Sequence, residues 1–159
     1  MCSTTLSAAT RTSSSTGSAS RRTDIKPGVS FPAAHPCWTG LLLAAATIPV
    51  FILLSEPLAR QWGALLLATI GGAYIGFAAR DGRSGAKIIE LAGALAFGVL
   101  GLAGLYFHPL WIAGGYVAHG FWDILHHRHG PYADTPRWYI PFCVVYDWII
   151  GAFLIIWWW

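Results

Sequence analysis

Residues 88–108 read IIELAGALAFGVLGLAGLYFH, and this stretch decides the fold class. It holds one carboxylate, Glu90, and no lysine or arginine. A helix rises 1.5 Å per residue, so a run of this length covers the ~30 Å hydrocarbon core of a bilayer. Because lipid offers no hydrogen-bond partner to backbone N–H and C=O groups, such a run must be helical to cross. The sequence predicts a transmembrane helix here.

Four further apolar runs surround this one, at residues 38–59, 62–79, 110–127 and 140–159. The whole chain has 159 residues, of which 55% are hydrophobic and 11% charged, and its mean hydropathy is +0.54. Ordinary soluble domains are about 25% charged. We therefore predict an all-α, polytopic membrane helical bundle of about five transmembrane helices over residues 37–159.

Residues 1–36 differ from the rest of the chain, because Ser, Thr and Arg dominate them. They lack the apolar core of a secretory signal, although their composition also resembles that of an organellar transit peptide. So polar a segment cannot bury enough apolar surface to fold. We interpret it as a disordered N-terminal tail.

The distribution of basic residues predicts the orientation of the bundle. With the N-terminus inside, nine of the ten Lys and Arg residues fall on the inner side and only Arg60 falls outside. The nine are Arg11, Arg21, Arg22, Lys26, Arg80, Arg83, Lys87, Arg128 and Arg137. Cytoplasmic loops carry such an excess, so the sequence predicts an N-in, C-out topology.

The run at 62–79 contains the sequence Gly72-Ala-Tyr-Ile-Gly76. Small residues at this spacing let two helices approach closely in a membrane. We expect this face to pack against a neighbouring helix.

The run at 110–127 ends in HGFWDILHH, residues 119–127, which places several ionisable side chains at the inner end of a membrane helix. At about 100° per residue, His119, Asp123, His126 and His127 fall on one stripe. Ionisable residues inside a membrane segment indicate a functional site by default.

The last run adds PFCVVYDW, residues 141–148, in which Tyr146 and Asp147 share a face. At ~1.5 Å per residue, Asp147 lies at a depth between those of Asp123 and His119. Glu90 begins the run at 88–108 near the same inner surface. The sequence therefore predicts one polar cluster in the inner half of the bundle.

Imidazole and carboxylate groups are ordinary ligands of zinc and of non-haem iron. His119 and His126 lie ~10.5 Å apart along the helix, too far to hold one ion together. The pairs His119/Asp123 and Asp123/His127 are one turn apart and could chelate, with Asp147 or Glu90 completing the shell.

Two simpler readings stay open. His127 could lie in the headgroup region, and His119 with Asp123 could be a buried hydrogen-bonded pair that only joins helices. The candidate ligands of Zn or Fe are His119, Asp123, His127, Asp147 and Glu90. The candidate catalytic residues are His119, Asp123, His126, Tyr146 and Asp147.

The motif pair H-G-x-W-D-x-x-H-H and P-F-C-x-x-Y-D-W resembles a small, uncharacterised family of bacterial integral membrane proteins. The resemblance covers about residues 110–153. It implies a multi-pass protein of the bacterial plasma membrane and carries no established activity. The membrane desaturases also place histidine clusters at the cytosolic face, but the six histidines of this chain are too few for their histidine boxes.

Three functions fit these observations. The first is a metal-dependent enzyme that acts on a lipid or isoprenoid-like substrate at the cytoplasmic leaflet. The second is a small-ligand or proton-coupled membrane protein, which with five helices and no internal repeat would need to form a homo-oligomer. The third is a structural subunit whose polar residues join helices. Membrane lipids are the expected surroundings in each case, and no nucleic-acid partner is expected.

Overall fold

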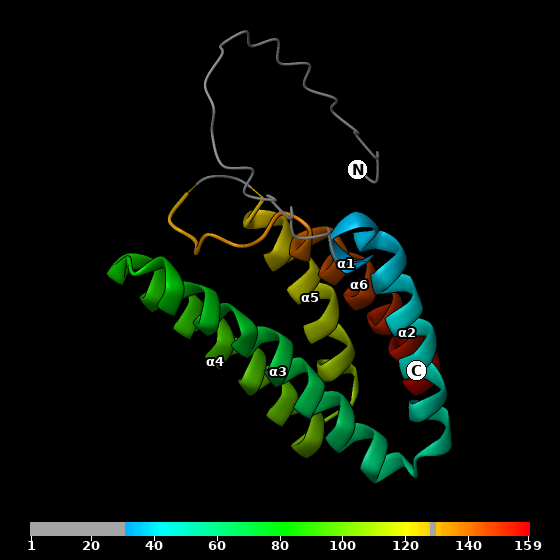
Figure 1. Ribbon diagram of the computed structural model, residues 1–159. Coiled ribbons are helices and arrows are strands. Elements are labelled where there is room, and N and C mark those ends of the chain that lie inside the picture. Colours follow the sequence, from blue (N-terminus) through cyan, green and yellow to red (C-terminus); the bar gives the residue numbers. More distant parts are fainter. Residues whose placement is uncertain (1–30, 128–129) are drawn as a thin grey trace, which may run out of the picture.

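The computed structural model describes residues 31–127 and 130–159, and within these ranges the fold is all-α with no strand, as expected. The helices are α1 (Phe31–Ala34), α2 (Pro36–Leu53), α3 (Glu56–Asp81), α4 (Ser84–Tyr106), α5 (Leu110–Leu125) and α6 (Tyr139–Trp158). Figure 1 shows α3 and α4 as an antiparallel pair, inclined to α2, α5 and α6. Helix α6 packs against both α2 and α5, and α5 joins this group to α4.

Four helices, α2, α3, α4 and α6, are long and apolar enough to cross a membrane. These lengths and compositions are those of an integral membrane protein. Helix α5 has 16 residues, which span ~24 Å and fall short of the ~30 Å hydrocarbon core. It lies along α6 and connects the far end of α4 to the beginning of α6 (Figure 1).

The first turn of the bundle lies six residues earlier than the spacing of apolar runs predicts. Leu54 and Ser55 have extended backbones, and Pro57 stands in the first turn of α3, where the proline ring fits a helix. Arg60 therefore lies inside α3, where its guanidinium pairs with Glu56. Both α2 and α3 have spanning length, so the predicted hairpin of two spans is retained.

The predicted N-terminal tail overlaps the helical part of the chain at its end. Residues 31–34 form α1, and α2 begins at Pro36. Residues 1–30 lie outside the described part of the chain.

The expected contact at Gly72 and Gly76 is wrong. A Cβ placed at either glycine would meet nothing within 4 Å. The close approach between α3 and α4 uses the preceding residue, Gly71, where a Cβ would lie 3.0 Å from the Cβ of Phe97. The spacing identified the right helix and the wrong face of it.

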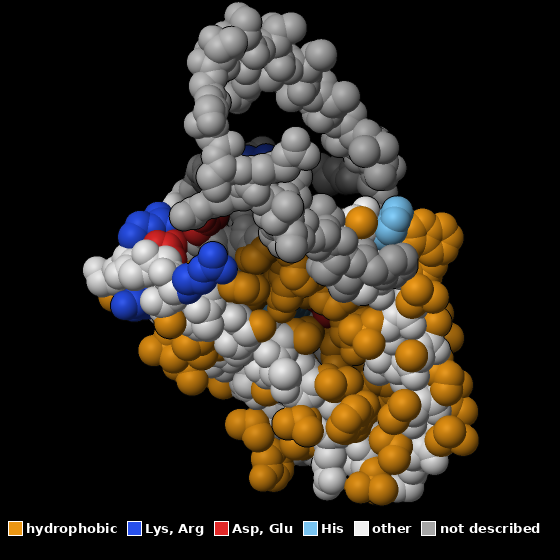
Figure 2. Space-filling view, viewed as in Figure 1, with side chains coloured by type: hydrophobic (Ala, Val, Ile, Leu, Met, Phe, Trp, Pro, Cys, Tyr) orange, Lys and Arg blue, Asp and Glu red, His pale blue; other side chains and the backbone are white. Residues whose placement is uncertain are grey.

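Polar and apolar side chains are separated on the surface of the bundle. Figure 2 shows hydrophobic side chains over most of the visible face of the helices, whereas Lys, Arg, Asp and Glu gather at the end where α3 meets α4. Four ionisable side chains are nevertheless completely buried inside: Glu90, His119, Asp123 and Asp147 are each 0% exposed. Charge buried in this way needs partners or a bound ion, because its desolvation is costly.

Candidate metal centre

His119 stands between two carboxylates. Its Nδ1 atom lies 2.7 Å from Oδ2 of Asp147 in α6 and 3.5 Å from Oδ2 of Asp123, one turn further along α5. The shorter contact is a hydrogen bond, and the longer one is too stretched to be a strong one. One imidazole atom therefore faces an oxygen from each of two acids.

The close approach of α5 and α6 makes this geometry attainable. A Cβ at Gly120, the residue after His119, would lie 2.3 Å from Nε1 of Trp148. A Cβ at Gly151 would lie 2.8 Å from a methyl of Val117 on α5. Both glycines let the two backbones approach, which brings Asp147 within bonding distance of His119.

Each of the three residues keeps a polar atom without a hydrogen-bond partner. These atoms are Nε2 of His119, Oδ2 of Asp123 and Oδ1 of Asp147. One ligand atom from each residue lies within 4.8 Å of the others, and all three side chains are buried. Imidazole and carboxylate are ordinary metal ligands, so these three side chains could hold a metal ion.

Tyr74, in α3, completes the surroundings of Asp123. Its hydroxyl donates a hydrogen bond to Oδ1 of Asp123. The tyrosine is fully buried, and its ring lies 5.8 Å from the imidazole of His119, measured between centroids. Tyr74 belongs to the Gly72–Gly76 stretch, where the sequence suggested only helix packing. A tyrosine in the inner half of an apolar run was the signal that this interpretation overlooked.

A second buried pair lies nearer the inner end of the bundle. Nε2 of His126 is 2.8 Å from Oε1 of Glu90, and the same oxygen accepts a hydrogen bond from the backbone N–H of Ala133 at 2.8 Å. Nδ1 of His126 is 2.9 Å from the carbonyl oxygen of Trp122. Glu90 of α4 is therefore hydrogen-bonded both to the C-terminal end of α5 and to the loop that follows α5.

The structure thus divides the predicted cluster. It brings His119, Asp123 and Asp147 into one group, whereas His126 and Glu90 form the separate pair. His127 is exposed at the inner end, and Tyr146 is buried with its ring 6.4 Å from that of Tyr116. Neither His127 nor Tyr146 belongs to the three-residue group.

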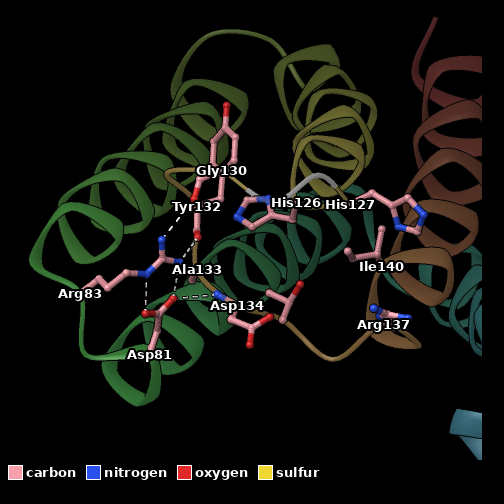
Figure 3. Close-up of a pocket in the computed structure, with 11 residues that line it drawn as sticks. Asp81, Arg83, His126, His127, Gly130, Tyr132, Ala133, Asp134, Arg137 and Ile140 are labelled. Atoms are coloured by element: carbon pink, nitrogen blue, oxygen red, sulfur yellow. Dashed lines mark hydrogen bonds and ion pairs between the residues drawn. The ribbon is translucent and has the colours of Figure 1, made fainter.

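The loop after α5 is held by ionic contacts that the sequence did not predict. Figure 3 shows Arg83 between Asp81 and this loop, where it donates to both carboxylate oxygens of Asp81 at 2.7 Å and to the carbonyls of Gly130 and Tyr132. The backbone N–H of Asp134 donates to Asp81. The hydrogen bonds and the charge of Asp81 raise the pKa of the Arg83 guanidinium. These contacts fix the loop over the inner end of α3 and α4.

A pocket of about 540 Å³ opens at this inner end. His126, His127, Arg83 and Arg137 contribute to its lining, and Figure 3 places His127 and Arg137 beside Ile140, away from Arg83. None of the three grouped residues lines it. His126 therefore lies between the aqueous end of the bundle and its buried centre.

Residues 36–158 match a family described as a family of unknown function, DUF6010. The chain belongs to this family. The match begins at the first residue of α2 and ends at the last residue of α6, so the DUF6010 region comprises all the helices that build the centre. Neither a curated protein nor a solved structure matches the chain.

Proposed function

We propose that this member of DUF6010 is a metal-dependent membrane enzyme whose Zn²⁺ or Fe²⁺ ion is held by His119, Asp123 and Asp147. The observation that carries the proposal is the convergence of these three buried side chains, with ligand atoms within 4.8 Å of one another. Among the described residues, no other three His, Cys, Asp or Glu side chains come together in this way.

Charge supports a divalent ion in particular. Two carboxylates as close as those of Asp123 and Asp147 repel one another in a medium of low dielectric constant. A divalent cation with two carboxylates and one neutral imidazole has no net charge. An electrically neutral set carries the smallest desolvation cost in an apolar interior.

An ion with three protein ligands keeps a coordination position for water or substrate, and it can polarise a carbonyl or phosphoryl oxygen there. The protein contributes the fixed ligand geometry and a site enclosed by Tyr74, Phe97 and the helices of the bundle. A molecule that reaches a site between membrane helices arrives from the lipid phase. We therefore infer a lipid or isoprenoid-like substrate that enters from the cytoplasmic leaflet of a bacterial plasma membrane.

A second function is favoured by one specific observation. His119, Asp123 and Asp147 are 0% exposed, and none of them lines the inner pocket. A substrate in that pocket would therefore not touch the proposed ligands. A carrier that encloses an ion or a proton would show the same burial. We keep a proton-coupled or ion-binding membrane protein as the alternative.

Elemental analysis of the detergent-purified full chain tests the metal centre. We expect about one Zn or Fe ion per chain and the loss of that ion in Asp147→Asn. The matched control is Asp134→Asn, which removes an exposed carboxylate of the inner loop. Wild-type protein without stoichiometric metal, after expression in zinc- and iron-supplemented medium, would overturn the proposal.

Enzyme and carrier are separated by a second measurement. The metal-loaded protein is reconstituted into vesicles of bacterial polar lipid, and the lipids are compared by mass spectrometry with vesicles that contain Asp147→Asn. A lipid altered only by the loaded wild type supports the enzyme. Unchanged lipids together with ion or proton flux across the vesicle membrane support the carrier and contradict the enzyme.

A further inference from the structure

Tyr74 is held in one position by the rings around it. Its centroid lies 4.3 Å from that of His126, 5.8 Å from that of Phe77 and 6.0 Å from that of Tyr139. Phe77 belongs to α3 and Tyr139 to α6, and His126 directly follows the last residue of α5. Because the side chain is fully buried among them, the hydroxyl has little freedom to leave its partner, Asp123.

The hydrogen bond from Tyr74 distinguishes the two oxygens of Asp123. Oδ1 accepts the tyrosine hydroxyl, whereas Oδ2 has no hydrogen-bond partner and lies 3.5 Å from Nδ1 of His119. Oδ2, the oxygen that faces His119, is therefore the one that has no hydrogen bond. Tethered in this way, the carboxylate presents a single oxygen to an ion.

The number of oxygens that a carboxylate presents affects which ion fits. Ca²⁺ takes about 6–8 oxygen ligands and commonly uses carboxylates through both oxygens, and Mg²⁺ needs six ligands and retains several waters. Zn²⁺ is satisfied by four ligands of mixed nitrogen and oxygen type. A buried site with one imidazole and with Asp123 tethered by Tyr74 therefore suits the ion of lower coordination number.

We propose that Tyr74 is a positioning residue that holds Asp123 as a one-oxygen ligand and so favours Zn²⁺ over Ca²⁺ and Mg²⁺. This inference rests on the metal centre proposed above. Groups that hydrogen-bond to metal ligands typically contribute about 10–100-fold to metal affinity. Tyr74 acts through Asp123 and does not itself touch the ion.

A matched pair of tyrosines makes the test specific. Tyr74→Phe removes the hydroxyl that joins α3 to Asp123 of α5. Tyr116→Phe removes an equally buried hydroxyl, which joins α5 to the carbonyl oxygen of Gly63 in α3 at 3.2 Å. Both variants lose one oxygen atom and one hydrogen bond between the same two helices, so both should fold and lose similar stability.

The full chain is purified in detergent, stripped of metal and titrated with Zn²⁺ against a chelating dye. We expect Tyr74→Phe to bind Zn²⁺ about 10–100-fold more weakly and to lose part of its preference over Ca²⁺. Tyr116→Phe should keep the wild-type affinity and preference. In Co²⁺-loaded protein, the visible absorption of Tyr74→Phe should weaken, because freeing the second oxygen raises the coordination number.

The results separate this inference from the metal centre itself. If the wild type and Tyr74→Phe bind Zn²⁺ equally well, with the same preference over Ca²⁺ and the same Co²⁺ spectrum, the role of Tyr74 is overturned while the centre stands. If both tyrosine variants weaken Zn²⁺ binding equally, the effect belongs to helix packing and the role of Tyr74 is overturned. If the wild type binds no metal, the proposed function fails and this inference fails with it.

Discussion

Asp123 takes part in two contacts that link separate helices. One oxygen accepts a hydrogen bond from the hydroxyl of Tyr74 in α3. The other oxygen faces His119, which is hydrogen-bonded to Asp147 of α6. Three helices therefore meet at one carboxylate. Replacing the carboxylate by the amide of asparagine shows whether the three helices meet here to bind an ion or only to pack together.

Double substitution of the two aspartates tests whether they act as one site. Asp123→Asn and Asp147→Asn should each lose most of the bound metal, because an amide is a poor substitute for an anionic ligand. The second substitution should cost less in the presence of the first, with an interaction energy of about 0.5–3 kcal/mol. The dissociation constants for Zn²⁺ of the wild type, both single variants and the double variant give this energy.

If these residues only join helices, an asparagine can keep the hydrogen bonds at either position. Both single variants would then fold and function as the wild type does. Additive losses of metal affinity would contradict a shared site in a different way, because independent ligands of separate ions behave additively. Thermal unfolding of each variant without metal serves as the control for folding.

The residues of the centre were predictable from the sequence to different degrees. The helical period placed His119 and Asp123 on one stripe, and depth counting placed Asp147 beside them; the structure brings these three together. His126 lies on the same stripe but bonds Glu90. Tyr74 could not be assigned, because its partner is 49 residues away in the sequence and the helices that join them must first be packed.

Glycines decide which faces of the helices meet. The Gly72–Gly76 spacing suggested a contact, yet a period of four residues says only that two small residues share a face. It does not say which helix, or the lipid, lies opposite. In the structure the close contacts include Gly71, which has no small residue four positions away, and Gly40, which has Ala44 there.

Gly40→Ala should loosen the contact between α2 and α6. The added Cβ would lie 2.4 Å from the backbone oxygen of Phe142, and a backbone atom cannot rotate away. Overpacking of this kind costs about 1–3 kcal/mol. Thermal unfolding in detergent should show a lower midpoint than for the wild type.

Gly72→Ala is the control within the same bundle. Its Cβ meets nothing within 4 Å, and replacing a mid-helix glycine by alanine favours the helix by about 0.5–1 kcal/mol. We expect an unchanged or slightly higher unfolding midpoint. An unchanged midpoint for Gly40→Ala would show that α2 does not approach α6 at Gly40 as described.

The helices alternate in direction, so their ends gather at the two ends of the bundle. Helices α2, α4 and α6 begin, and α3 and α5 end, toward the same end of the bundle (Figure 1). Arg80, Arg83 and Lys87 belong to this end, whereas Arg60 at the other end is paired with Glu56. Apolar runs predicted this alternation of helices, while the exact turns depended on local signals such as Ser55 and Pro57.

Helix α5 runs from one end of the bundle to the other, although it is shorter than the four helices of spanning length. Helix α4 ends at one end of the bundle and α6 begins at the other, so the chain between them has to pass through. Helix α5 is ~24 Å long, whereas the hydrocarbon core is ~30 Å thick. If α5 crosses the membrane, the residues that flank it must span the remaining distance. Tilting or local thinning of the bilayer can accommodate such a mismatch.

Reporter fusions along the full chain test both the orientation and the passage of α5. Fusions after Arg83, His108 and Arg137 should report inside, outside and inside, because basic residues are retained on the cytoplasmic side. A fusion after Trp159 should report outside and serves as the control for α6. If the fusion after Arg137 reports outside, α5 does not return, the inner pocket faces the wrong side, and His119 lies open to a different leaflet. A lipid substrate would then have to come from the outer leaflet, and the inner-leaflet proposal would be withdrawn.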